Sequence, residues 1–474
     1  MLKKFSAFFI LLFTSFFWQQ SFVIADSKAP SLIRDAETEK FLRDLSRPIF
    51  ISANLNPNQI SIYIVNDSTL NAFVAGGQNV FINSGLIRKY STPDTLIGVI
   101  AHESGHIAAG HLARAQEGSE TAQGAMLLSY LLGIGAALGG SPDAAIALIA
   151  GGSQTANRLF MKYTRGQEEA ADNHAIEYLA KMQYPAAGLI NLLEFFESEM
   201  IGYQGEIDEY LLSHPVSKKR IDLIKARTLN TKFSDQKINQ KLQPQMDQVL
   251  AKLEGFMENP EMILEKYKNQ NDDLSNYKKL IAFFRKGEVK KALPMLDSLI
   301  QKNSTITLKS KYDSSQIGFL YELKGQILFE SGQIIDSIIA YNKAIKFLTP
   351  QDSAQAKIAF ASAILVLPKD DKDLIKLALD KLFEAKKYEN ENPFLFKQIA
   401  VAYAKTGDEA KSMLALAEFN CMIDQKEKCR KYAKEAKEKL DKNAVSELLR
   451  ADDLLELTAE EKKEKEKEKK KFNF

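Results

Sequence analysis

The segment His102-Glu103-Ser104-Gly105-His106 decides the fold, because it places two histidines four residues apart with a glutamate next to the first. On an α-helix, four residues correspond to about 400° of rotation, so both imidazoles lie on one face and can bind one ion. The glutamate then points at the remaining coordination position, where it can take a proton from a water molecule. The segment therefore predicts a helix that carries a catalytic zinc ion on His102 and His106, with Glu103 as general base.

The residues before this segment predict where the helix begins. Thr92 is a typical N-cap, Pro93 a typical first helical residue, and Asp94 places an acid in the first turn. The apolar residues 96–100 then lead directly to His102. We therefore expect one helix from near Pro93 through His106.

A small sheet is expected upstream of that helix. Residues 60–65 alternate between apolar and polar and then become fully apolar, as strands do. Residues 71–74 and 79–83 flank Gly76-Gly77, which predicts a hairpin. We expect the strand at 79–83 to present a free sheet edge, on which an extended polypeptide can pair through backbone hydrogen bonds.

A catalytic zinc ion usually has a third protein ligand. The other histidines are His111, His174 and His214. His111 lies five residues after His106, which is about 140° away from the ligand face of the helix. It therefore fits a helix surface, or a position behind a ligand, better than it fits a ligand.

Two acids offer a better third ligand. Glu168 and Asp172 are four residues apart, so they share one face of a second predicted helix. One carboxylate could bind the zinc ion while the other orients a ligand histidine through its ring N–H. A pair of solvated surface acids is the alternative.

Several motifs in this order resemble the M48 family of zinc peptidases. They extend over residues 40–225 and comprise Asn71-Ala72-Phe73, Gly76-Gly77, Ser84-Gly85-Leu86, the His102 segment, His111, and Arg165-Gly166-Gln167-Glu168-Glu169-Ala170-Ala171-Asp172. The resemblance implies a single zinc ion with Glu168 as its third ligand. It also implies that Asp172 supports a histidine ligand.

The resemblance continues in Ser213-His214-Pro215-Val216-Ser217-Lys218-Lys219-Arg220. It implies that His214 belongs to the active site, as an oxyanion or substrate contact or as a gate over the metal. Arg220 is implied to accompany it. A loop histidine without a role is the alternative for His214.

The first residues predict an export signal. Lys3 and Lys4 precede an apolar run over residues 5–18, and Val23-Ile24-Ala25 precedes Asp26. These features are typical of a signal peptide that is cleaved after Ala25. An uncleaved anchor is the alternative, although the run is shorter than the ~20 residues that span a bilayer. In a bacterium, the protein would then work in the periplasm, free or associated with a membrane.

Residues 126–150 form a second apolar segment, rich in glycine and alanine. It consists of two apolar arms, 126–132 and 144–150, and each arm is too short to span a membrane. We expect a helical hairpin that packs on the domain or on a second copy, with peripheral membrane contact as the alternative.

The second half of the chain predicts helical repeats. Characteristic positions of a tetratricopeptide repeat are occupied by Tyr321, Gly325, Leu328, Gly332, Tyr341, Ala344 and Pro350, and the first four again by Phe396, Ala400, Tyr403 and Gly407. Small residues at these positions let an aromatic side chain of the partner helix pack closely. Cys421 and Cys429 are the only cysteines, and either a disulfide or two buried thiols would fit them.

Composition and patterns together predict the organisation of the chain. Its 474 residues, 45% hydrophobic and 26% charged, suggest two or three domains, and a net charge of +2 gives no global sign of a nucleic-acid partner. We expect an α+β fold: a mainly helical zincin-type metalloprotease domain with a small sheet, followed by an all-α tetratricopeptide-like repeat domain. The expected boundaries are a signal peptide at 1–25, the protease domain at 26–229, a linker with short helices at 230–272, the repeats at 273–445 and a charged tail at 446–474.

An exported M48 peptidase with such repeats resembles peptidases of the Gram-negative envelope that degrade stalled or misassembled outer-membrane proteins and associate with the barrel-assembly machinery. The resemblance implies unfolded or misassembled proteins as substrates and that machinery as a partner. A repeat-based chaperone or scaffold with a silent or gated zinc site is a different class of function. A membrane-embedded M48 peptidase would need two long apolar spans, which residues 126–150 do not supply.

Overall fold

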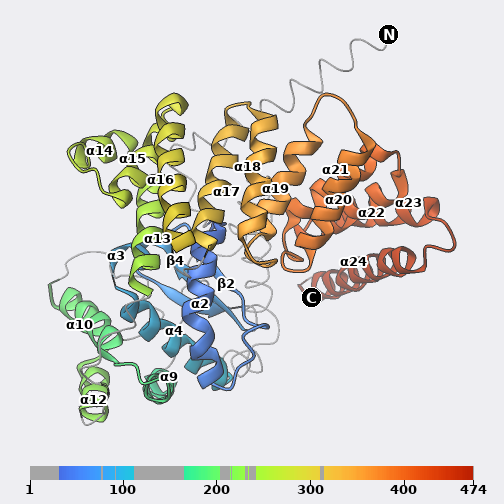
Figure 1. The fold of residues 1–474 in the computed structure, drawn as a ribbon. Helices are drawn as coiled ribbons and strands as arrows, with labels where there is room; N and C mark the ends of the chain where they lie inside the picture. Colours follow the sequence, from blue (N-terminus) through green and yellow to red (C-terminus); the bar gives the residue numbers. More distant parts are fainter. Residues whose placement is uncertain are drawn as a thin grey trace. The chain divides into compact units, whose positions relative to one another are not determined.

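The computed structural model confirms the predicted fold class, a small sheet with helices followed by a helical region (Figure 1). The predicted signal peptide, the segment 126–150 and Gly76-Gly77 lie outside the residues that it describes. No helix in the described part of the chain is long and apolar enough to cross a membrane. The described residues are 31–75, 78–90, 92–111, 165–202, 214, 216–229, 233, 242–309 and 314–472.

Among the described residues, four strands form the sheet, in the order β1-β2-β4-β3. The predicted hairpin is confirmed, because β3 and β4 pair antiparallel with Phe73 opposite Phe81. The strands are β1 (Leu32–Ile33), β2 (Ile62–Val65), β3 (Ala72–Ala75) and β4 (Asn79–Asn83).

The expected free edge at Asn79–Asn83 is wrong. This strand, β4, pairs in parallel with β2 on one side and antiparallel with β3 on the other, so its backbone groups are used on both sides. Of the strands that the structure describes, β3 is the one at the sheet edge next to β4. Asn71 accepts a hydrogen bond from the amide of Asn83, and because ladder residues alternate, the backbone groups of Ala72 and Val74 point away from β4.

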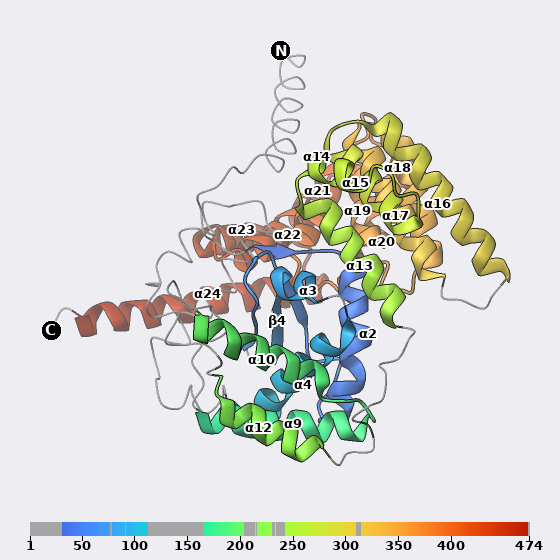
Figure 2. The same ribbon diagram turned by 90° about the vertical axis from the view of Figure 1, so that its left-hand side faces the viewer.

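Helices pack against this sheet and share one core with it. Figure 1 shows α2 and α4 next to the strands. Figure 2 shows α9 and α10 beside α4, and α12 packs on α9 and α10. Leu42 of α2, Ile82 of β4, Ile100 of α4 and Leu193 of α10 are among the fully buried core residues. The helices of this region are α2 (Ala36–Ser52), α3 (Ser84–Lys89), α4 (Pro93–Ala108), α9 (Arg165–Lys181), α10 (Ala187–Gly202) and α12 (Lys218–Thr228).

The described residues from Leu242 onwards are mainly helical, and successive helices from α15 onwards pack against each other. Several of them begin or end with a local signal, such as Pro393 in the first turn of α21 or the left-handed Gly407 at its end. They are α13 (Leu242–Met257), α14 (Pro260–Lys266), α15 (Asp273–Arg285), α16 (Val289–Lys309), α17 (Ser315–Glu330), α18 (Ile334–Phe347), α19 (Ala354–Leu365), α20 (Lys372–Lys386), α21 (Pro393–Thr406), α22 (Glu409–Met422), α23 (Lys426–Lys439) and α24 (Val445–Phe472).

Helix α13 contributes to two hydrophobic cores at once. Met246, Val249 and Leu253 lie in the core that contains the sheet, whereas Ala251 lies in a second core with Tyr277 of α15. The neighbouring Lys252 is buried and forms ion pairs with Asp35 and Glu37, at the start of α2. The segment that the sequence suggested as a linker therefore holds a packed helix.

A second set of ion pairs joins residues 34–43, at and just before the start of α2, to the helical region. Arg34 contacts both carboxylate oxygens of Glu389, at 2.7 and 2.8 Å, and also Glu39 at 2.8 Å. Arg43 pairs with Asp352. Because Arg34 and Glu389 are largely buried, this contact, made by Nη2 alone, is better shielded from solvent than an ordinary surface ion pair.

Cys421 and Cys429 form a disulfide, with Cα atoms 5.0 Å apart. The bond joins the last turn of α22 to the first turn of α23. The structure therefore decides between the two alternatives that the sequence left open.

The predicted small-against-large contact of a repeat can be tested at Gly325. A Cβ atom at this position of α17 would lie 2.6 Å from ring atoms of Tyr341 in α18. Since Tyr341 is buried, we expect Gly325→Ala to destabilise the protein by about 1–3 kcal/mol. Urea denaturation of the purified protein would measure this loss. In a double-mutant cycle, Tyr341→Leu should reduce the cost of Gly325→Ala, and additive effects would contradict the proposed contact.

Candidate metal centre

Helix α4 presents two imidazoles and a carboxylate to one point. Pro93 opens the helix after Thr92, as predicted, and the helix is buried along most of its length. His102 and His106 lie one turn apart, with their Nε2 atoms 3.1 Å from each other. Glu103 lies beside them and is fully buried.

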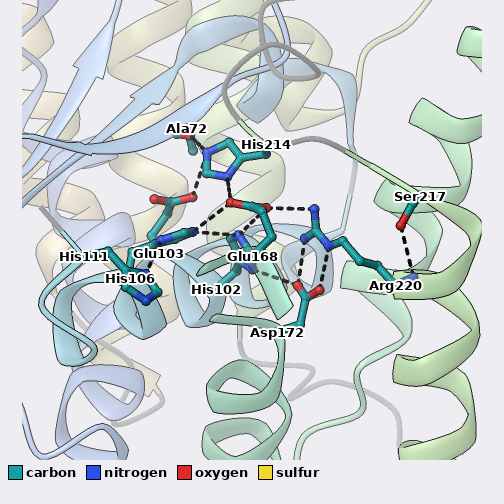
Figure 3. Close-up of polar contacts among 10 residues, drawn as sticks. All are labelled: Ala72, His102, Glu103, His106, His111, Glu168, Asp172, His214, Ser217 and Arg220. Atoms are coloured by element: carbon teal, nitrogen blue, oxygen red, sulfur yellow. Dashed lines mark hydrogen bonds and ion pairs between the residues drawn. The ribbon is translucent and has the colours of Figure 1, made fainter. Parts of the chain in front are cut away.

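Helix α9 brings Glu168 to the same point (Figure 3). The Oε2 atom of Glu168 is 3.4 Å from Nε2 of His102, and its Oε1 atom is 3.3 Å from Nε2 of His106. This approach requires close helix packing, and Gly105 of α4 provides it. A Cβ atom there would lie 2.8 Å from the carbonyl oxygen of Ala171.

His214 completes the cluster from a segment between α10 and α12. Its Nδ1 atom is 3.1 Å from Oε1 of Glu168, and its Nε2 atom is 3.2 Å from the carbonyl oxygen of Ala72 on β3. The same Nε2 atom is 3.5 Å from Oε1 of Glu103. Four residues each offer one potential ligand atom here, and these four atoms all lie within 4.8 Å of one another. The residues are His102, His106, Glu168 and His214.

Asp172 and Arg220 form a second layer behind these residues. Oδ1 of Asp172 is 3.0 Å from Nδ1 of His102, on the side of the ring that faces away from Glu168. Arg220 contacts Asp172 through Nε and Nη2, at 2.7 and 2.9 Å, and Glu168 through Nη1 at 2.7 Å. Ser217 caps α12 by accepting the amide hydrogen bond of Arg220, which helps to place this arginine.

The buried charges perturb one another strongly. Burial alone would lower the pKa of His102, but the carboxylates of Glu168 and Asp172 outweigh it and raise that pKa to about 10. For His106, burial lowers the pKa to about 3. Burial also raises the pKa of Glu103, against the opposing effect of His214 and His102. Burial would raise the pKa of Glu168 too, yet the same two histidines hold it well below its usual range.

The arrangement fits a divalent metal ion. Two imidazole nitrogens and one carboxylate are a donor set that first-row metal ions, zinc among them, accept. Within the described part of the chain, both carboxylate oxygens of Glu103 are buried and have no hydrogen-bond partner. Such a group is costly unless something pairs with it, and a water molecule on a metal ion would donate the missing hydrogen bond.

The structure brings together all of the residues that the sequence suggested for the site, which are His102, Glu103, His106, Glu168, Asp172, His214 and Arg220. His174 lies outside the group and stacks on Tyr178. The contact of His214 with the Ala72 carbonyl could not be predicted from residue types, because every residue has a backbone carbonyl. It also left the position of His111 open, and the ring of His111 lies 2.9 Å, Nδ1 to Nδ1, from His106.

The contact at Gly105 yields a prediction about metal affinity. In Gly105→Ala, the new Cβ would meet two backbone atoms of Ala171, at 2.8 and 2.9 Å, which no side-chain rotation can relieve. We expect α9 to move away and zinc affinity to fall by about 10–100-fold, as for other losses of ligand support. Competition with a chromophoric chelator would measure the affinity.

Gly166→Ala is the matched control, because a Cβ at this exposed position of α9 meets no atom within 4 Å. Its zinc affinity should equal that of the unsubstituted protein. Unchanged zinc affinity in Gly105→Ala would show that the helix contact does not place Glu168.

Comparison with known proteins agrees with this geometry. The model of "Peptidase family M48" matches residues 34–228. The beta-barrel assembly-enhancing protease of Yersinia pestis is 28% identical over 190 residues, which cover 40% of this chain and 39% of that protein, and the same protease of Escherichia coli K12 is 27% identical over equal shares. Metalloprotease LoiP of Escherichia coli K12 is 25% identical over 202 residues, or 43% of this chain and 75% of LoiP.

The similarity to the assembly-enhancing proteases thus spans about two fifths of their length. The match to the family model covers the sheet and the helices that carry the metal cluster. Residues 34–228 of this chain are a peptidase family M48 domain.

Proposed function

We propose that this chain is a zinc-dependent endopeptidase of the periplasm that degrades misfolded or stalled outer-membrane proteins. The observation that carries the proposal is the buried cluster of His102, His106 and Glu168 next to the carboxylate of Glu103, which accepts no hydrogen bond from the described residues. Within an M48 domain, this cluster is the expected place for a catalytic ion. A zinc ion held there would lower the pKa of a water molecule and polarise the scissile carbonyl.

The residues around the cluster have distinct roles in this proposal. Glu103 accepts a proton from the attacking water and later delivers one to the leaving amine. A carboxylate with a raised pKa suits this exchange, because it can hold the proton between the two steps. Asp172 orients His102 through the ring Nδ1–H, and Arg220 offsets the charge of Asp172 and Glu168.

His214 is the proposed contact to the oxyanion or substrate. Both of its ring nitrogens lie within hydrogen-bond distance of other groups, Glu168 on one side and the Ala72 carbonyl on the other. In this arrangement, His214 has to turn away from Ala72 before it can donate to an oxyanion. It therefore also has the position of a gate over the metal cluster.

The edge strand β3 is the proposed site for pairing with the substrate backbone. The backbone groups of Ala72 and Val74 point away from β4, and Ala72 lies directly beside His214. A polypeptide that adds to this edge as a further strand would pass the metal cluster with its backbone extended. Only unfolded segments offer such a backbone, which suits the removal of misfolded proteins.

The proposed location and partners are supported by the relatives, by the first residues of the chain and by the disulfide. The similar proteases are named for enhancing β-barrel assembly, which supports a substrate in the outer-membrane pathway. The residues at 1–25 have the pattern of an export signal, and the disulfide of Cys421 and Cys429 suits an oxidising compartment. The helical region from α15 to α24 is the proposed docking surface for substrates or for the barrel-assembly machinery.

The peptidase mechanism is tested by Glu103→Gln. The substitution keeps the size of the side chain but removes the base, so cleavage of an unfolded outer-membrane protein should slow by about 10²–10⁴-fold. Zinc content should stay the same, since Glu103 is not among the proposed ligands. Glu177→Gln, on the exposed side of α9, is the matched control and should cleave normally.

The same pair of variants separates the peptidase from a chaperone or scaffold. If Glu103→Gln with full zinc occupancy cleaves as fast as the unsubstituted protein, the proposed mechanism is wrong. If no preparation cleaves the unfolded protein but all of them suppress its aggregation, the chaperone alternative holds.

The export proposal predicts a shortened mature chain. Protein purified from the periplasm should begin at Asp26, and intact mass spectrometry would establish this N-terminus. A chain that retains Met1 and resists salt extraction from membranes would indicate the uncleaved anchor instead.

A further inference from the structure

His111 lies beside the metal cluster although a continuing helix would carry it elsewhere. Helix α4 ends at Ala108, and the amides of Ala109 and Gly110 donate to Gly105 and Ile107 at its last turn. Gly110 has a φ of +62°, in the left-handed region that favours glycine. The chain therefore turns sharply after the helix.

This turn brings the imidazole of His111 back beneath that of His106. Their Nδ1 atoms are 2.9 Å apart, and the two rings meet edge to face, with centroids 5.0 Å apart and planes at 67°. His111 is buried, with 6% of its surface exposed. Without the turn at Gly110, the residue five positions after His106 would lie about 140° away from the ligand face.

The hydrogen bond between the two rings has only one direction that suits metal binding. The Nε2 atom of His106 faces His102 and Glu168, so it is the nitrogen that would bind the ion. A neutral imidazole that binds through Nε2 carries its proton on Nδ1. The Nδ1–H of His106 then donates to Nδ1 of His111, which must carry its own proton on Nε2.

We infer that His111 is a positioning residue of the metal centre, which holds the ring of His106 and its Nε2 lone pair toward the ion. The inference rests on the proposed zinc site. It gives the two histidine ligands different supports: a carboxylate, Asp172, behind His102, and a neutral imidazole behind His106.

A neutral support at this place suits the charge of the site. Glu103, Glu168 and Asp172 already place three carboxylates within the buried cluster, and Arg220 contacts only Glu168 and Asp172 of these three. A further carboxylate behind His106 would add another buried negative charge. An imidazole accepts the hydrogen bond without adding one.

The test compares His111→Ala with His111→Asn in the full-length protein. Alanine removes the acceptor, so zinc affinity should fall by about 10–100-fold in a chelator competition. The side-chain oxygen of asparagine can take the place of Nδ1, so His111→Asn should recover most of this loss. His174→Asn is the matched control, because His174 lies outside the metal cluster, and it should bind zinc like the unsubstituted protein.

A second measurement does not depend on how well the variants fold. Nitrogen-15 NMR of the zinc-loaded protein with labelled histidines should find a proton on Nδ1 of His106 and on Nε2 of His111. A proton on Nδ1 of His111, or equal zinc affinity in His111→Ala and the unsubstituted protein, would overturn the inference. If the unsubstituted protein binds no zinc at all, the proposed function fails instead.

Discussion

The whole metal centre depends on the close contact between the backbones of α4 and α9. Glycine at position 105 lets the carbonyl of Ala171 approach to a distance at which any side chain would collide. A glutamate side chain is short, so only this approach lets Glu168 reach both His102 and His106. The same contact sets Asp172 behind His102, one turn further along α9.

The close packing of these helices places several carboxylates in a buried site, and the positive charge of Arg220 partly offsets their negative charge. Its guanidinium group contacts Glu168 and Asp172 simultaneously, so one cation lies between two carboxylates from the same helix. An unpaired buried carboxylate costs several kcal/mol, and the arginine, together with His102, lowers the pKa of Asp172 against the effect of burial. Arg220, which lies 48 positions after Asp172 in the chain, is thus as much a part of the site as the proposed ligands.

Local patterns allowed much of this to be predicted from the sequence. The start of α4, the hairpin of β3 and β4, and the shared face of Glu168 and Asp172 follow from residues close together in the chain. The order of the strands could not be predicted, because the parallel pairing of β2 with β4 joins separate segments. The position of His111 depends on the helix end at Gly110, and a glycine is only a frequent signal for such an end.

Helix α13 has a consequence for how the chain can be divided. Met246, Val249 and Leu253 fill the core around the sheet, while the opposite side of the helix belongs to the core of α15. A truncated chain that stops at residue 229 would keep every metal ligand but would expose the apolar surface that these three side chains cover. Evolution could therefore exchange the helical region for another one only if the replacement brought its own helix to cover that surface.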